Sequence, residues 1–310
     1  MGGGSGMIGL IGRLGSCLPF SWLQPGPGGP LFLPFYHLVS EEPAPHIRHL
    51  YPVCSIQRFR ADLEWMLRYY EPVGLEELER KVKNGRPVVH LSFDDGLRQC
   101  AEVIAPILWE KGIPATFFIN PSFVGNRALM YRYKASLLVE ADPAHRVDYL
   151  SIGYRDRGWL DERARQVGVD FELFLREYRP YMGLDQLDDL VRQGFNLGGH
   201  SMDHPMYRAL TLEDQVRQTL ESVDWVRSRW GVTAAFAFPF TDDGVLPAFF
   251  DKIPADWRTF GTAGFKLDEL ARHWQRVPME RYIDPMSRVV PGIIIAYWLK
   301  RWIGRSWVRR

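Results

Sequence analysis

The stretch Val88-Val-His-Leu-Ser-Phe-Asp-Asp-Gly96 decides the fold prediction, because a short apolar run ends in two adjacent carboxylates and a glycine. Helix-like sequence over 97–111 follows, so the order is strand, turn, helix. Side chains just beyond the C-terminal end of a parallel strand lie where α/β folds build their active sites. Gly96 permits a sharp turn of the chain. We therefore expect Asp94 and Asp95 to approach one cavity instead of pointing to opposite faces.

Short apolar runs alternate with helix-like segments along the rest of the body. The clearest helix is expected over 55–70, with Ser55 as its N-cap. The expected strands are 31–38, 88–93, 115–119, 195–198, 234–238 and 259–262. This alternation predicts an α/β fold with a parallel sheet, and six or more such strands suit a closed barrel as well as an open sheet.

Three segments differ from this pattern and define the expected domain organisation. Residues 1–29 read as a flexible N-terminal segment, 30–288 as the folded body and 289–310 as a basic, apolar C-terminal segment. Within the body, residues from about 128 to 182 contain no convincing strand, so we expect a helical insertion. That insertion either covers the flank of the sheet or forms a lid or substrate wall.

Composition excludes several classes of protein. The 310 residues are 46% hydrophobic and 24% charged, which is typical of a globular chain with a large core. Lys and Arg total 38 against 37 for Asp and Glu, so the net charge of +1 argues against general nucleic-acid binding. Cys17, Cys54 and Cys100 have no short metal-binding spacing and cannot form a disulfide framework.

The two ends of the chain bear on localisation. No apolar run reaches the roughly 18 residues that a membrane-spanning helix needs. A signal peptide has its positive charge before its apolar core, whereas here Arg13 comes after the N-terminal apolar stretch. Leu14-Gly-Ser-Cys17 weakly resembles the cleavage site of a lipoprotein signal peptide. The simpler interpretation is that the N-terminal residues form a mobile tail. The apolar stretch 289–299 precedes Lys300 and Arg301, which fits either a helix docked on the domain or contact with lipid headgroups. A cytoplasmic or peripheral membrane location is therefore favoured.

A second polar constellation follows another apolar strand, in Gly198-Gly-His-Ser-Met-Asp-His204. Two imidazoles four residues apart, expected on one helical turn, can each reach one cation at about 2.0 Å. A carboxylate from elsewhere in the chain would be the third ligand, and a position would remain open for water. The alternative is that these histidines serve packing alone.

Ser92-Phe-Asp-Asp-Gly96 and the later His200-Ser-x-x-His204 together closely resemble the first two motifs of the polysaccharide deacetylase family, the NodB-like carbohydrate esterases. The resemblance implies a distorted (β/α) barrel of about seven strands. It implies that Asp94 is the general base and that Asp95, His200 and His204 bind a divalent metal, most simply Zn²⁺, with Co²⁺, Ni²⁺ or Mn²⁺ as other candidates. Phe35-Tyr-His37 and the segment 111–118 also resemble family sequence.

Two later motifs depart from the family pattern. Phe236-Ala-Phe-Pro-Phe-Thr241 keeps Pro239 and Phe240, whose backbone N–H is expected to serve as an oxyanion donor, but Ala237 stands where many members have an arginine. The Leu-x-His motif that supplies the general acid in members of the family is missing, and His273 is the nearest histidine. Arg276 or Glu280 is expected to line the pocket instead.

The expected activity is hydrolysis of N-acetyl groups on an amino-sugar polysaccharide or glycolipid, by water that the metal and Asp94 activate. Without another acid, Asp94 would return the proton to the departing amine. Two alternatives stay open: an amidase or esterase acting on a different acylated substrate, and a non-catalytic carbohydrate-binding barrel. The expected partner is a glycan or glycolipid, with possible membrane contact through the C-terminal segment and neither a nucleic acid nor a protein partner.

Overall fold

A computed structural model of the chain describes residues 20–24, 29–42, 44–80, 82–83 and 85–309. Its main sheet has eight strands in the order β10-β9-β8-β7-β6-β5-β1-β11, and every neighbouring pair is parallel. The strands are β1 (Pro34–Tyr36), β5 (Leu91–Phe93), β6 (Ala115–Ile119), β7 (Asn196–Gly199), β8 (Ala235–Ala237), β9 (Arg258–Gly261), β10 (His273–Gln275) and β11 (Val277–Pro278).

The strands at the two ends of this order, β10 and β11, are consecutive in the sequence and are separated only by Arg276. Residues 273–275 pair with β9 and residues 277–278 pair with β1, so the segment 273–278 joins the first strand to the last. The sheet therefore closes into a distorted barrel with seven strand positions around it. The predicted barrel of about seven strands is confirmed.

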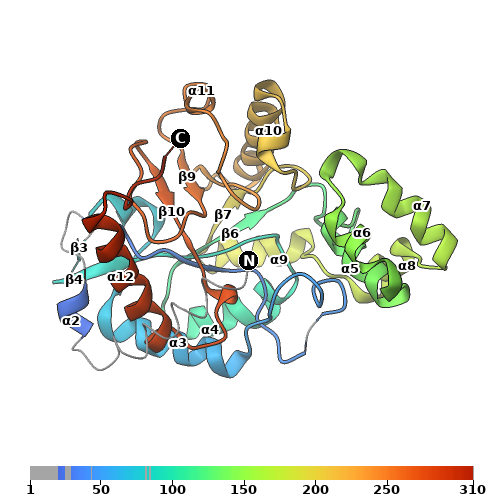
Figure 1. The fold of residues 1–310 in the computed structure, drawn as a ribbon. Helices are drawn as coiled ribbons and strands as arrows, with labels where there is room; N and C mark the ends of the chain where they lie inside the picture. Colours follow the sequence, from blue (N-terminus) through green and yellow to red (C-terminus); the bar gives the residue numbers. More distant parts are fainter. Residues whose placement is uncertain (1–19, 25–28, 43, 81, 84, 310) are drawn as a thin grey trace.

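Helices surround the barrel (Figure 1). They are α2 (Phe20–Leu23), α3 (Ile56–Tyr69), α4 (Ala105–Glu110), α5 (Tyr131–Ala141), α6 (Arg146–Ser151), α7 (Gly158–Val167), α8 (Phe171–Tyr178), α9 (Leu184–Arg192), α10 (Leu212–Trp230), α11 (Pro247–Phe250) and α12 (Met286–Trp302). A three-stranded sheet lies beside the barrel, formed by β2 (Glu71–Pro72), β4 (Arg86–Val89) and β3 (Val82–Lys83). Short helical turns include η4 (Tyr154–Asp156) and η6 (Met279–Arg281), and η2 (Cys100–Ile104) is a π-helix.

Each of the six expected strands overlaps an observed one, and α3 begins after Ser55, whose hydroxyl accepts a hydrogen bond from Arg58 N. The helix expected over 97–111 begins later, at Cys100, with the π-helix η2 ahead of α4. Its first residues are engaged elsewhere, because Leu97 forms a bridge with Tyr181 and Arg98 N donates to Pro180 O at 2.8 Å. These contacts attach the end of the insertion to the residues that follow β5.

Within the expected insertion, four helices, α5 to α8, form a lobe at the right of Figure 1. Tyr133, Leu138 and Tyr149 are fully buried, and they join the main hydrophobic core of the molecule. The lobe is thus packed onto the barrel as one body with it.

The close approach of β7 to its neighbours explains the paired glycines before His200. A Cβ on Gly198 would lie 2.5 Å from the ring of Phe118, and one on Gly199 would lie 2.6 Å from Ser222 Oγ. Both contacts are far shorter than packed atoms tolerate. Only glycine lets α10 and β6 pack this tightly against the strand that leads to His200.

The chain ends with α12, which packs against α3 and α2. No helix in the part of the chain that the structure describes is long and apolar enough to cross a membrane. Cys54 and Cys100 are buried free thiols, while Cys17 and the N-terminal segment around it lie outside the described residues. The expected limits of the body at 30 and 288 stay a prediction.

Candidate active site

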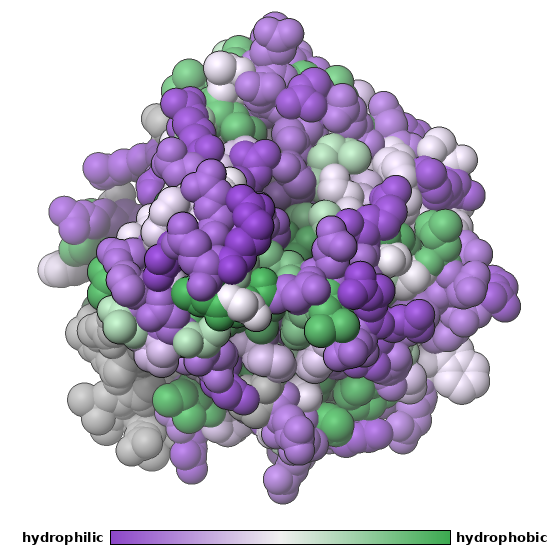
Figure 2. Space-filling model, turned by 90° about the vertical axis from the view of Figure 1, so that its right-hand side faces the viewer, coloured by the Kyte–Doolittle hydropathy of each residue, from purple (hydrophilic) through white to green (hydrophobic). Residues whose placement is uncertain are grey.

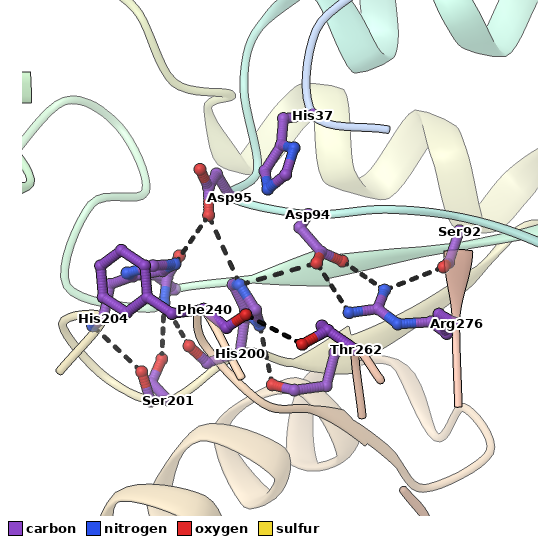
Figure 3. Close-up of polar contacts among 12 residues, drawn as sticks. His37, Ser92, Asp94, Asp95, His200, Ser201, His204, Phe240, Thr262 and Arg276 are labelled. Carbon is purple, nitrogen blue, oxygen red and sulfur yellow. Dashed lines mark hydrogen bonds and ion pairs between the residues drawn. The ribbon is translucent and has the colours of Figure 1, made fainter. Parts of the chain in front are cut away.

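Seven residues meet where the barrel strands end (Figure 3). They come from strands that are distant in the sequence but neighbours in the barrel, as parallel topology requires. They are His37 after β1, Asp94 and Asp95 after β5, His200 after β7, His204 in the same loop, Phe240 after β8, and Arg276 between β10 and β11.

Asp95, His200 and His204 form a compact group around one point. Asp95 Oδ1 lies 3.4 Å from His200 Nε2 and 3.2 Å from His204 Nε2. The potential ligand atoms of the three side chains all lie within 4.8 Å of one another. All three side chains are buried, so the structure brings together the residues that the sequence assigned to a metal.

The outer atoms of these side chains are fixed by further contacts. His200 Nδ1 donates to Ala237 O at 2.7 Å, and Nε2 of the same ring faces Asp95. Tyr133 OH, from α5 in the insertion, donates to Asp95 Oδ2 at 2.6 Å and leaves Oδ1 for the imidazoles. Asn120 Nδ2 donates to the carbonyl of His200 and steadies the loop backbone. The facing atoms of His200 and Asp95 are therefore held toward one another.

The backbone around this group adopts conformations that residues other than glycine rarely take. Asp95 has φ 71°, His204 has φ 60° and Phe240 has φ 59°, all in the left-handed region. Such conformations cost energy and persist where the surrounding structure imposes them. Gly96, with φ 64°, continues the turn after Asp95, so both carboxylates reach the cavity side as the sequence predicted.

The expectation that His200 and His204 share a helical turn is wrong, because residues 200–206 form a loop. Ser201 has φ 63°, and its hydroxyl accepts a hydrogen bond from His204 N at 3.0 Å. Pro205 also disfavours a helical conformation at His204. The loop nevertheless brings the two rings within 4.9 Å of each other, centroid to centroid.

The donor set fits a divalent cation. Asp95 Oδ1 is buried without a hydrogen bond, and two imidazole nitrogens face it from the other side of the same small space. Two nitrogens and one carboxylate oxygen are the ligands that zinc and similar metals use in catalytic sites with an open position. Burial alone would raise the pKa of Asp95, but the facing imidazoles outweigh it and hold that pKa well below its ordinary value. Burial lowers the pKa of His204, which keeps that ring neutral and able to bind a metal.

Asp94 is held by an arginine from the strand that closes the barrel. Arg276 Nη1 and Nη2 donate to Asp94 Oδ1 and Oδ2 at 2.7 and 2.8 Å, a bidentate pair with both side chains buried. Burial would raise the pKa of Asp94, but Arg276 outweighs it, so the pKa lies below its ordinary value and Asp94 is ionised. Asp94 Oδ2 also lies 3.9 Å from His200 Nε2, beside the candidate metal position.

Arg276 is fixed in turn by its surroundings inside the barrel. Nη1 also donates to Ser92 Oγ at 2.9 Å, and the guanidinium lies 4.2 Å from the ring centroid of Phe35 and 5.2 Å from that of Phe118. Ala237 stands at the motif position where many family members have an arginine. In this chain Arg276, from a different part of the barrel, contacts Asp94 instead.

His37 lies beside Asp94 and Asp95 and is the titratable group that the sequence reasoning left without a role (Figure 3). Its Nδ1 is 2.6 Å from Glu280 Oε2, and Glu280 Oε1 accepts hydrogen bonds from the backbone N–H groups of His37 and Leu38. Burial opposes protonation of this ring, but Glu280 outweighs it and raises the pKa of His37 to about 9. His37 is also 22% exposed, whereas the side chains of the candidate metal group are almost fully buried.

Phe240 lies over the candidate metal group. Its ring centroid is 4.4 Å from that of His204, edge to face, and its backbone N–H makes no hydrogen bond within the described residues. Thr262 Oγ1 donates to Phe240 O at 2.9 Å, and Thr262 N donates to Asp242 Oδ1 at 3.1 Å. This network holds the unusual backbone of Phe240 in place.

The insertion contributes to the site at more than one position, which favours the substrate wall over the flank cover. Besides the bond from Tyr133, Tyr154 OH donates to Asp203 in the histidine loop, and the ring of Tyr131 lies 6.3 Å from that of Phe240. The side of the molecule that carries this lobe is mostly hydrophilic, with small hydrophobic groups toward its middle (Figure 2).

A second group, Asp242, Asp268 and His273, also has ligand-type atoms close together. Its centre is filled by the amide nitrogen of Gln275, which lies 2.8 Å from Asp242 Oδ2, 2.9 Å from Asp268 Oδ2 and 3.0 Å from His273 Nε2. Ala263 N donates to Gln275 Oε1 and fixes that orientation of the amide. His273, the nearest histidine to the missing motif, belongs to this structural network and not to the group around Asp95.

Comparison with known proteins supports the same family. The sequence profile described as "Polysaccharide deacetylase" matches residues 81–242, which is more than half of the chain. A search among curated protein sequences finds no match. Among solved structures, a de-N-acetylase from Aggregatibacter actinomycetemcomitans has a TM-score of 0.58 at 13% identity, covering 85% of this chain and 99% of that one.

Two further solved structures share the fold. The Streptococcus pyogenes deacetylase PplD, in complex with acetate, has a TM-score of 0.56 at 14% identity and covers 84% of this chain and 97% of its own. IcaB from Ammonifex degensii has a TM-score of 0.55 at 16% identity and covers 86% and 97%. At these identities the likeness establishes the barrel fold.

The Asp94–Arg276 pair generates a stability prediction. Arg276→Met should lower the free energy of unfolding by about 3–5 kcal/mol, because Asp94 would keep a buried charge without a partner. The double variant D94N/R276M should be clearly more stable than R276M, since neither position of the pair then carries a buried charge. Denaturant unfolding of the two single variants and the double variant measures this coupling.

Arg281→Met is the matched control, because Arg281 is exposed in the same turn region, and its effect should stay within about 0.5 kcal/mol. If R276M unfolds at the same denaturant concentration as R281M, the guanidinium does not stabilise Asp94.

Proposed function

The chain belongs to the polysaccharide deacetylase family, and we propose that it removes acetyl groups from N-acetylated amino sugars of a glycan or glycolipid with the help of a bound divalent metal. The observation that supports this most is the buried group of Asp95, His200 and His204 with the ionised Asp94 beside it. Hydrolysis of an amide requires both a strong nucleophile and a base, and this arrangement offers sites for each.

Asp95 Oδ1, His200 Nε2 and His204 Nε2 are the proposed ligands of the metal, most simply Zn²⁺. A divalent cation held there would supply Lewis acidity, which lowers the pKa of water and polarises the acyl carbonyl. The contacts from Ala237 O and Tyr133 OH orient two of these ligands, as outer contacts commonly do in metal sites.

Asp94 is the proposed general base. Its carboxylate would take a proton from the water that attacks the acetyl carbon. Arg276 keeps this carboxylate ionised and fixes its direction, because both oxygens accept from the guanidinium. Such proton transfer by a positioned side chain is typically worth about a hundredfold to ten-thousandfold in rate.

His37 is the proposed general acid. The carbon–nitrogen bond breaks as the amine leaves, and the nitrogen needs a proton. Nδ1 of His37 faces Glu280, so Nε2 is the nitrogen available to give that proton. The products are then acetate and a free amine, while His37 and Asp94 exchange their protons with solvent. The N–H of Phe240 would donate to the oxygen that gains negative charge during attack.

The substrate class follows from the family and from the shape of the site. The description of the Aggregatibacter protein as a de-N-acetylase supports an N-acetyl group as the one removed. Tyr131, Tyr154 and Phe240 give an aromatic wall beside the buried group, and sugar rings commonly stack on such side chains. The partly exposed His37 indicates the side from which the acetyl group arrives.

Asp94→Asn tests the base. We expect turnover of N-acetylglucosamine oligomers to fall at least about a hundredfold, while the metal content stays near that of the unaltered protein, because Asn keeps the shape of the side chain. His200→Ala should instead lose most of the metal. Release of free amine and elemental analysis of the purified protein give the two readouts.

His145→Ala is the matched control for His200→Ala, because His145 is an exposed histidine in the insertion. Full turnover by D94N would remove Asp94 from the mechanism. An unaltered protein that is folded, free of metal and inactive would argue for the non-catalytic carbohydrate-binding barrel.

The pair His37–Glu280 generates a pH prediction. The raised pKa means that His37 keeps its proton up to about pH 9, so activity should fall as the pH rises through that value. Glu280→Gln removes the carboxylate that stabilises the protonated ring, so this decline should move to lower pH. A profile of kcat/KM against pH for both proteins measures the shift, and identical alkaline limbs would exclude His37 as the acid.

A further inference from the structure

The C-terminal end of α12 and the residues after it expose large apolar side chains together. Trp302 is 87% exposed, Ile303 54%, Leu299 56%, Trp307 45% and Trp298 38%. Burial of such side chains is the usual outcome in a folded domain, so a group of exposed ones marks a surface that contacts something else. We call Trp298, Leu299, Trp302, Ile303 and Trp307 the C-terminal patch.

The patch is continuous in space with the start of the described chain. Trp298 and Trp302 are four residues apart on α12 and therefore lie on neighbouring turns of one side. Ile303 is the C-cap of the same helix and follows Leu299 by four residues. Trp298 Nε1 donates to Leu23 O at 3.0 Å, which ties α2 to this end of α12. Trp22 of α2 is itself 76% exposed and extends the patch. In Figure 1, α2 and α12 lie on the side of the barrel opposite the insertion.

The charge around the patch is mainly positive. Lys300, Arg301, Arg305 and Arg309 lie among its apolar residues, and the sequence has no Asp or Glu after Asp284. Within the described residues none of these four side chains forms an ion pair, in contrast to the many paired arginines elsewhere, such as Arg217. Arg305 and Arg309 share a hollow of about 300 Å³ with Lys266 and Trp307, and two carboxylates, Asp242 and Asp243, also line it. Asp242 accepts a hydrogen bond from Gln275 and Asp243 lies 3.9 Å from Arg208, so both have other polar neighbours. The patch is therefore apolar and aromatic, with an excess of cations around it.

We propose that the C-terminal patch docks this protein on the surface of an anionic lipid bilayer. Tryptophan side chains favour the headgroup region, where the ring is half apolar and its N–H stays hydrated. Lysine and arginine beside them are attracted to anionic headgroups, each strengthening binding about fivefold. Since no described helix is long and apolar enough to cross a membrane, the patch lies on the bilayer instead of spanning it.

A second copy of the chain fits the patch less well than a bilayer does. In a two-fold symmetric dimer the same patch meets itself, so the unpaired cations of one copy would face those of the other. Like charges brought together at an interface oppose association. An anionic bilayer offers opposite charge and an apolar layer at once.

Vesicle co-sedimentation of the full chain tests the proposal without reference to catalysis. We expect binding to vesicles of phosphatidylcholine mixed with phosphatidylserine, little binding to phosphatidylcholine alone, and weaker binding as salt is raised, because salt screens the cationic attraction. R301Q/R305Q should weaken binding about 25-fold at about fivefold per cation. Trp302→Ser should weaken it about tenfold, since an aromatic anchor is lost.

Matched controls come from elsewhere on the surface. Trp109→Ser alters a tryptophan that is 66% exposed on α4, and R176Q/K252Q removes two exposed cations outside the patch. Both should bind vesicles as the unaltered protein does. Every patch variant should also keep its turnover of soluble N-acetylglucosamine oligomers, which separates this proposal from the proposed function.

Equal binding by the patch variants and their controls would overturn the proposal, and so would binding that is indifferent to phosphatidylserine. Absence of vesicle binding together with a dimer in sedimentation velocity that W302S dissociates would also overturn it, in favour of a second copy as the occupant.

Discussion

Two adjacent carboxylates are buried at the end of β5, and the arrangement of the site follows from the need to compensate their charges. A buried carboxylate without a partner is strongly destabilising. Asp94 finds its partner in Arg276, and Asp95 faces the imidazoles of His200 and His204. The two carboxylates are therefore placed in different environments, one beside a fixed guanidinium and one beside nitrogens that can bind a metal. In the proposed mechanism this difference lets Asp94 act as the base while Asp95 is a metal ligand.

The closure of the barrel makes this compensation possible. Arg276 lies between the strand pieces that pair with β9 and with β1, so the residue that completes the barrel also neutralises Asp94 inside it. Glu280, a few residues later, holds His37 at the end of β1. The short segment from Arg276 to Glu280 thus positions both a proposed base and a proposed acid. The insertion adds Tyr133 to the outer oxygen of Asp95, so the lobe and the barrel build the site together.

Much of the fold and of the central group could be predicted from the sequence, for identifiable reasons. Apolar runs such as 115–119 mark buried strands, and the pair Asp94-Asp95 before Gly96 requires a turn that points both side chains inward. The strand over 273–278 could not be predicted, because His273, Gln275 and Arg276 are polar and their burial depends on partners far away in the sequence. The role of His37 could not be predicted either, because its partner Glu280 lies 243 residues later in the sequence. The loop of His200 and His204 looked helical by spacing, but its left-handed residues and Pro205 decide otherwise.

The central claim is that Asp95, His200 and His204 hold one divalent cation beside Asp94. Anomalous diffraction from crystals grown with zinc tests it most directly. The account predicts one strong peak about 2.0–2.3 Å from Asp95 Oδ1 and from Nε2 of both histidines. A well-ordered site without a peak there, or a peak among Asp242, Asp268 and His273 instead, would contradict it.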